Sequence, residues 1–96
     1  MYIGVLQFSM AIPHAESLKD KRAVVQSLKE RLRQKYNIAI AETEDLDEWT
    51  YATFGAATVG NDVKRLNSVL DKVVDVLETW RDATLEAHQI EIVRPA

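Results

Sequence analysis

Cysteine is absent from this sequence of 96 residues. Its absence excludes disulfide bonds, thiol nucleophiles and thiolate metal sites, and it fits a reducing cytosol. No apolar run approaches the roughly 18 residues that a membrane-spanning helix requires. The opening residues 1–10 are interrupted by Gly4, Gln7 and Ser9 and lack a basic lead-in, so they do not resemble a signal peptide. We therefore expect a cytoplasmic protein with one domain over residues 1–96.

The charges are strongly segregated along a chain whose net charge is only −3. The segment 19–35 contains seven lysine and arginine residues and two acidic residues. The segment 42–48 contains five acidic residues and no basic residue. This distribution predicts one basic surface and one acidic loop, and the acidic total argues against a protein that coats nucleic acid with its whole surface.

The first 37 residues predict a strand followed by a helix. Residues 2–12 alternate with a period of two, which is typical of a half-buried strand, and Pro13 ends this strand. Ser17 is a good N-cap, and Asp20 places a carboxylate near the positive end of the helix. The helix continues to residues 35–37 and carries an apolar stripe at helical spacing. The predicted inward residues are Tyr2, Leu6, Phe8, Met10 and Ile12 of the strand and Leu18, Val25, Leu28 and Leu32 of the helix.

The remaining residues predict two more strands, a second helix and a final strand. Asp62 is a good cap for the second helix, whose apolar residues recur at spacings of three and four up to Trp80. In the third strand we expect Phe54 and Ala56 to face inward. We expect Trp49 and Trp80 to lie in the core, and a contact with a partner is the alternative for Trp49. The predicted segments are strand 38–41, acidic loop 42–48, strand 49–59, the helix after Asp62, and strand 85–93.

This β-α-β-β-α-β order predicts the α+β ferredoxin-like fold. Two right-handed crossovers interleave, and the natural closure is a four-stranded antiparallel sheet with two helices on one face. The sequence contains no internal repeat, low-complexity segment or linker that would divide the chain.

Two segments carry a resemblance to a known family. The box Ser-Leu-Lys-Asp-Lys-Arg at 17–22 and the residues Gly55 and Gly60-Asn61-Asp62 resemble the YlxP-like family of small bacterial proteins of unknown function, and the segment 45–49 is a looser match. The resemblance covers nearly the whole chain. It implies a ferredoxin-like fold and a bacterial cytoplasmic protein, often encoded near translation and ribosome-maturation factors. It implies no catalytic residues.

The first helix contains the candidate anion-binding residues. Lys19, Arg22, Lys29 and Arg33 lie on one side of the helix, where they could follow an RNA backbone or form the soluble side of an amphipathic helix. Lys21 joins them in the first turn, where cations oppose the helix dipole. The segment 19–22 is therefore either an anion-binding edge at the helix start or an internal charge clamp that pairs with Glu16 or the acidic loop.

The face of the sheet away from the helices is the second candidate surface. Val5, Gln7, Tyr51 and Thr53 are predicted there among small residues, and Tyr51 is the single aromatic ring. RNA-recognition motifs need several rings for base stacking, so this face suits a flat protein partner such as a second copy of the chain. A solvated face with scattered small residues is the alternative.

Motifs for catalysis or for metal and cofactor binding are missing. His14 and His88 have no cysteine or serine motif with which to form a triad or a metal site. The loop 10–15 has no glycine, so it cannot cradle phosphate as an acylphosphatase of this fold does. The acidic segment lacks the Asp-x-Asp-x-Asp-Gly spacing of a calcium loop. We expect a non-enzymatic binding module without a cofactor, which docks on RNA or a ribosomal particle through the first helix or forms a homodimer through the sheet.

Overall fold

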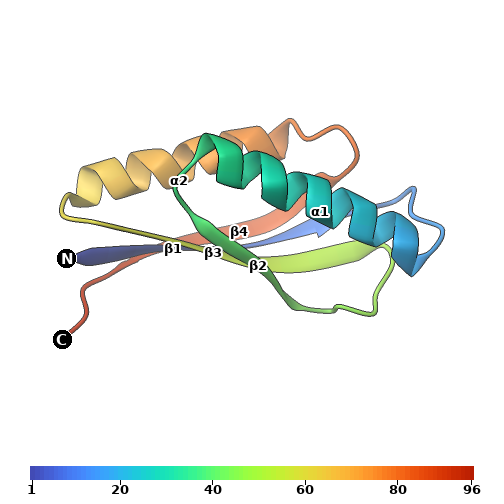
Figure 1. Ribbon diagram of the computed structural model, residues 1–96, viewed down its shortest axis with the longest axis horizontal. Coiled ribbons are helices and arrows are strands. Elements are labelled where there is room, and N and C mark those ends of the chain that lie inside the picture. Colours follow the sequence, from blue (N-terminus) through green and yellow to red (C-terminus); the bar gives the residue numbers. More distant parts are fainter.

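A computed structural model describes residues 1–96 and confirms the ferredoxin-like fold. The strands follow the order β2-β3-β1-β4, every neighbouring pair is antiparallel, and both helices cover the same face of the sheet (Figure 1). The elements are β1 (Tyr2–Ala11), α1 (Leu18–Lys35), β2 (Ala39–Glu44), β3 (Tyr51–Gly60), α2 (Val63–Glu78) and β4 (Thr84–Val93).

The core lies between the sheet and the two helices. The alternation of β1 buries Leu6, Phe8 and Met10 against the helices, as predicted. Phe8 lies opposite Phe54 of β3, and their rings stack with centroids 4.8 Å apart. Burial of such large side chains on one face supplies most of the stability of a sheet and helix layer. The helices complete the core with Val25, Leu28 and Leu32 of α1 and Leu66, Leu70, Val73, Val74 and Leu77 of α2.

Both predicted helix caps are present. Ser17 Oγ accepts a hydrogen bond from the Asp20 backbone N–H at 3.1 Å, and the Asp20 carboxylate accepts one from the Glu16 N–H at 3.0 Å. Asp62 Oδ1 accepts from the backbone N–H of Lys64 at 3.0 Å. These bonds satisfy N–H groups that a helix start would otherwise leave without partners.

The boundaries of β2 and β3 differ from the predicted ones. β2 continues to Glu44 rather than ending at residue 41, because Glu42 turns toward a buried cation of α1 and its backbone continues the ladder with β3. β3 begins at Tyr51, and the prediction that Trp49 lies in the core is wrong because its side chain is 50% exposed. Trp80 is partly buried against the core, with the Arg31 guanidinium 5.4 Å from its ring centroid.

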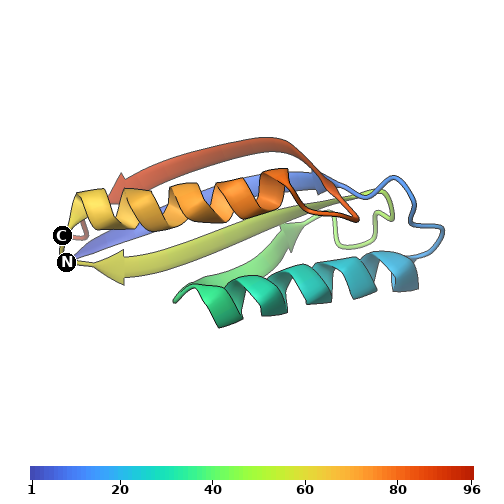
Figure 2. The ribbon, with the colours of Figure 1, turned by 90° about the horizontal axis from the view of Figure 1, so that it is seen from above.

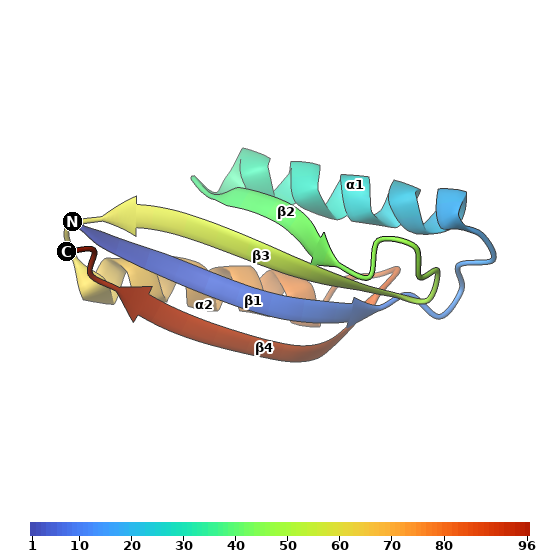
Figure 3. The ribbon, with the colours of Figure 1, turned by 90° about the horizontal axis from the view of Figure 1, so that it is seen from below.

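The sheet is elongated and only one of its faces is covered. The molecule measures 43 × 25 × 21 Å, with the long strands running along the longest direction (Figure 2). Figure 3 shows the other face of the sheet with no element in front of it. Residues 1 and 96 lie at one end of the sheet, and the β2–β3 connection lies at the other. Neither helix is long and apolar enough to cross a membrane.

Candidate binding surfaces

Lys21 is fully buried in the first turn of α1. Its ammonium lies 2.7 Å from Glu42 Oε2 of β2 and donates a hydrogen bond of 2.6 Å to the backbone carbonyl of Asp45. Glu42 is 14% exposed, and its Oε2 has no partner other than this ammonium. A buried charge is tolerated only when it is paired and hydrogen-bonded, so Lys21 and Glu42 depend on each other.

The carbonyl that Lys21 binds belongs to a residue with an unusual backbone. Asp45 has φ of 61°, in the left-handed region that non-glycine residues rarely adopt. Its carbonyl also accepts from the Glu48 N–H at 3.1 Å, and its carboxylate accepts from Thr53 Oγ at 3.0 Å. These three bonds fix the start of the connection 45–50, so this acidic loop has a defined conformation.

The structure separates Lys21 from the other predicted anion-binding residues. Because Lys21 is buried and paired, it cannot contact an RNA phosphate, and the alternative of an internal charge clamp describes it correctly. Arg33 is exposed but donates a 2.9 Å hydrogen bond to the Ile40 carbonyl of β2. Lys19 and Arg22 are exposed and Lys29 is half-buried, and none of these three lies within 4.0 Å of a carboxylate.

The uncovered face of the sheet has few charges. We call it the open face, and Glu44 and Glu91 are the two charged residues that the strand registers place on it. The Asp45 carboxylate reaches the same face, where it accepts the hydrogen bond from Thr53. The four predicted interface residues all lie there: Val5 and Thr53 are half-buried, and Gln7 and Tyr51 are exposed. Its members are Ile3, Val5, Gln7, Ser9, Ala11, Ala39, Ala41, Thr43, Glu44, Tyr51, Thr53, Gly55, Ala57, Val59, Thr84, Ala87, Gln89, Glu91 and Val93.

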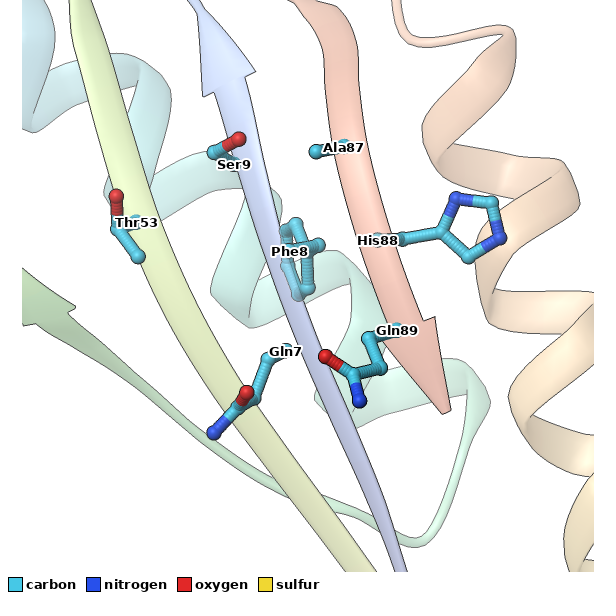
Figure 4. Close-up of a pocket in the computed structure, with 7 residues that line it drawn as sticks. All are labelled: Gln7, Phe8, Ser9, Thr53, Ala87, His88 and Gln89. Atoms are coloured by element: carbon cyan, nitrogen blue, oxygen red, sulfur yellow. The ribbon is translucent and has the colours of Figure 1, made fainter. Parts of the chain in front are cut away.

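Shallow depressions cover the middle of the open face. One of about 300 Å³ lies among Gln7, Ser9, Thr53 and Gln89, whose side chains point out of the sheet in Figure 4. A second of about 330 Å³ crosses β2 and β3, where the side chains are small. A Cβ atom on Gly55 would lie 3.2 Å from Thr43 Cγ2. Because glycine has no side chain, the surface between β2 and β3 stays hollow at this position.

The acidic loop carries exposed apolar side chains, of which Leu46 was assigned to no surface and Trp49 was expected in the core. Leu46 is 56% exposed and Trp49 is 50% exposed, and Tyr51 follows at the start of β3 with 39%. The negative charge of Asp45, reinforced by that of Glu48, raises the pKa of the Tyr51 hydroxyl above 10.0. The alternation of acidic and large apolar residues over 45–51 was the available signal, because neither kind of residue packs against the core there.

The two histidines lie on different parts of the molecule. His14 lines a hollow of about 150 Å³ with Asp20 and Asp82 near the start of α1. His88 lies on β4, and Figure 4 shows its ring directed away from the open face. No group of three histidine, aspartate or glutamate side chains is arranged to hold a metal ion.

Comparison with known proteins places the chain in a family. Residues 3–90 match the family described as protein of unknown function DUF503. The chain belongs to this family. It is also 31% identical over 78 residues to the uncharacterized protein YlxP of Bacillus subtilis, a match that covers 81% of this chain and 85% of that protein. The YlxP-like resemblance of the sequence is thereby confirmed, and the function of this family is unknown.

Removal of the Lys21 charge should destabilise the fold. Lys21→Met leaves the Glu42 carboxylate without its partner, and we expect the free energy of unfolding to fall by about 3 kcal/mol. Lys21→Met with Glu42→Leu removes both charges and should recover most of that loss. Urea unfolding followed by circular dichroism measures both variants, and a Lys21→Met protein as stable as the parent would contradict the role of the pair.

Neutralisation of the acidic loop should change the ionisation of Tyr51. Asp45→Asn removes the larger of the two negative charges while retaining a residue that tolerates positive φ, so the pKa of Tyr51 should fall. Glu48→Gln should lower this pKa by a smaller amount. Ultraviolet absorbance titration of variants in which Tyr2 and Tyr36 are phenylalanine isolates the signal, and an unchanged titration in Asp45→Asn would contradict this prediction.

Proposed function

We propose that this chain is a non-enzymatic protein-docking module whose open face binds a second copy of the chain. The observation that carries the proposal is the low density of charge on that face. In the whole chain 28% of the residues are charged, whereas Glu44 and Glu91 are the two charged residues that the strand registers place on the open face. Depletion of charged residues is the compositional mark of an interface core, and a solvated surface has no need of it.

The size of the open face is sufficient for a homodimer. Three strands of ten residues and one of six, spaced as in an ordinary sheet, make a surface of roughly 570 Å² for each copy. Two copies would bury roughly 1,100 Å², which is close to the lower limit for a specific and stable interface.

The shape of the open face also suits a second sheet. Two twisted sheets pack face to face at about 30°, with their backbones about 10 Å apart. Close approach requires small side chains, and Ala41, Gly55 and Ala57 supply them across β2 and β3. Because both partners use the same surface, the contact is isologous and stops at the dimer.

A second candidate function involves the other side of the molecule. We propose that α1 docks on an anionic partner, and the observation that favours it is that Lys19, Arg22 and Lys29 have no carboxylate within 4.0 Å. The gene neighbourhood that the YlxP-like resemblance implies makes RNA or a ribonucleoprotein particle the partner to test first. The two functions are compatible, because α1 covers the face of the sheet opposite to the open face (Figure 1).

A charge placed on the open face should dissociate the dimer. Thr53→Glu buries an uncompensated carboxylate twice in a two-fold interface, so sedimentation should show a monomer at concentrations where the parent is a dimer. Because Thr53 also bonds Asp45, Val5→Glu provides a second test without that bond. Ser68→Glu on α2 is the matched control and should remain dimeric. A parent protein that is monomeric at all concentrations would contradict the proposal.

Reversal of the free cations of α1 should weaken binding to RNA. Purified ribosomal subunits serve as the probe, and Arg22→Glu with Lys29→Glu should lower both the affinity and its salt dependence, by about 0.7 to 0.9 in slope for each phosphate that the variant no longer neutralises. The control variant Lys72→Glu reverses one charge on the neighbouring helix α2. It should bind the subunits as the parent does. An equal decrease in the affinity of the control, or no binding by the parent at low salt, would contradict this second function.

A further inference from the structure

The connection between β2 and β3 exposes two large apolar side chains close together. Leu46 and Trp49 are each at least half exposed, and both lie in the acidic loop 45–50. Figure 3 shows this loop at one end of the sheet with no other element in front of it. Exposed apolar residues that cluster in this way mark contact surfaces, and tryptophan is among the residues most enriched at the energetic centre of an interface.

The acidic loop is held at both of its ends. At its start, the Asp45 carbonyl accepts hydrogen bonds from Lys21 and from the Glu48 N–H. At its end, the Thr50 carbonyl accepts a hydrogen bond of 2.6 Å from the Ile12 N–H. A surface that already has one conformation loses less conformational entropy on binding than a mobile loop does. The two apolar side chains are therefore presented on a preformed surface.

No cation neutralises the carboxylates around these apolar side chains. Residues 36–63 contain no lysine or arginine, and the ammonium of Lys21 is already paired with Glu42. Like charges held close together repel one another, so they do not stabilise the loop. The exposed carboxylates without a cation within 4.0 Å are those of Glu44, Asp45, Asp47 and Glu48.

The negative charge of the loop selects among possible partners. Nucleic acids and anionic lipid surfaces are repelled by exposed carboxylates. A second copy of the chain carries almost all of its cations on α1 and α2, whereas its open face adds the charges of Glu44 and Glu91. A contact between the loop of one copy and a helix of the next is heterologous and does not close into a dimer. The complementary partner is therefore a basic segment of a different protein.

We infer that the acidic loop docks a basic segment of another protein, in which arginine or lysine residues neighbour apolar ones. A cation of the segment lies over the ring of Trp49, whose negative face attracts it, and the adjacent carboxylates accept its hydrogen bonds. An apolar side chain of the segment covers Leu46. This inference goes beyond the proposed homodimer, because Leu46 and Trp49 lie in the loop and not on a strand of the open face.

Three synthetic peptides test the chemistry of the partner. The first repeats the sequence Arg-Leu-Arg-Gly, the second has serine in place of each leucine, and the third has glutamate in place of each arginine. Burial of a leucine side chain is worth enough for the parent protein to bind the first peptide about tenfold more tightly than the second. The third peptide should not bind. Calorimetric titration at low salt measures all three.

Substitution of Trp49 tests the position of the site. Trp49→Ala should weaken binding of the first peptide by about tenfold or more, as truncation of a central aromatic residue does. Trp49→Phe retains an aromatic ring and should retain most of the affinity. Because this side chain is exposed, both variants should fold as the parent does. Val63→Ala shortens an exposed apolar side chain on α2 and is the control that should leave the affinity unchanged.

Removal of charge from the loop tests the electrostatic part. Asp47→Asn with Glu48→Gln should weaken binding of the first peptide and reduce the loss of affinity on addition of salt, because fewer exposed charges remain to be screened. Asp71→Asn with Asp75→Asn removes the same charge from exposed residues of α2. This matched control should bind the peptide as the parent does.

Two results would overturn the inference. If the arginine peptides bind equally with and without leucine, or if Trp49→Ala keeps the parental affinity, the loop is only a nonspecific acidic surface. An equal loss of affinity in the α2 control would place the contact elsewhere on the molecule. These measurements do not depend on the oligomeric state, so failure of the proposed homodimer and failure of this docking site are distinguishable.

Discussion

The pairing of Lys21 with Glu42 joins the first turn of α1 to the end of β2 and to the loop beyond it. α1 belongs to the helix layer, and the residues from 42 to 45 belong to the edge of the sheet and the loop beyond it. One buried ammonium connects them by an ion pair and a hydrogen bond. Removal of either partner leaves an isolated charge in a site with little access to water, which is far more costly than the loss of an exposed ion pair. The loop therefore follows α1, and the left-handed backbone of Asp45 is held in place.

This arrangement changes the interpretation of the first helical turn. Three cations in this turn oppose the helix dipole, which suggests an anion site. In the structure Lys21 is buried and its ion pair stabilises the fold, while Lys19 and Arg22 are exposed to solvent. Helical spacing could have made this distinction, because Lys21 belongs to the same buried stripe as Val25 and Leu28. A lysine on an apolar stripe, together with an acidic residue on a nearby strand, was the signal that separated it from its neighbours.

Most of the fold could be predicted from periodicity and caps. The alternation of residues 2–12, the N-caps Ser17 and Asp62, and the stripe of α2 each depend on local geometry, and each agrees with the structure. The errors lie where long-range contacts decide. β2 extends through Glu42 and Glu44 because of a partner in α1, and Trp49 leaves the core because the loop is anchored at Asp45. The alternation of acidic and large apolar residues over 45–51 was a local signal that this loop is exposed. The conformation of the loop could not be predicted in the same way, because it depends on long-range contacts of Asp45 with Lys21 and Thr53.

The Arg33 hydrogen bond to Ile40 has a consequence for how the protein stays in solution. β2 is an edge strand, and an unpaired edge is a template on which further strands can add until a fibril grows. The guanidinium from α1 occupies a backbone carbonyl of that edge, so an incoming strand would have to displace a charged group. β4 has no such contact, so the addition of a strand is easier at β4 than at β2. Addition at β4 alone joins two sheets edge to edge and stops there, so the contact on β2 lowers the tendency of this fold to form open-ended polymers.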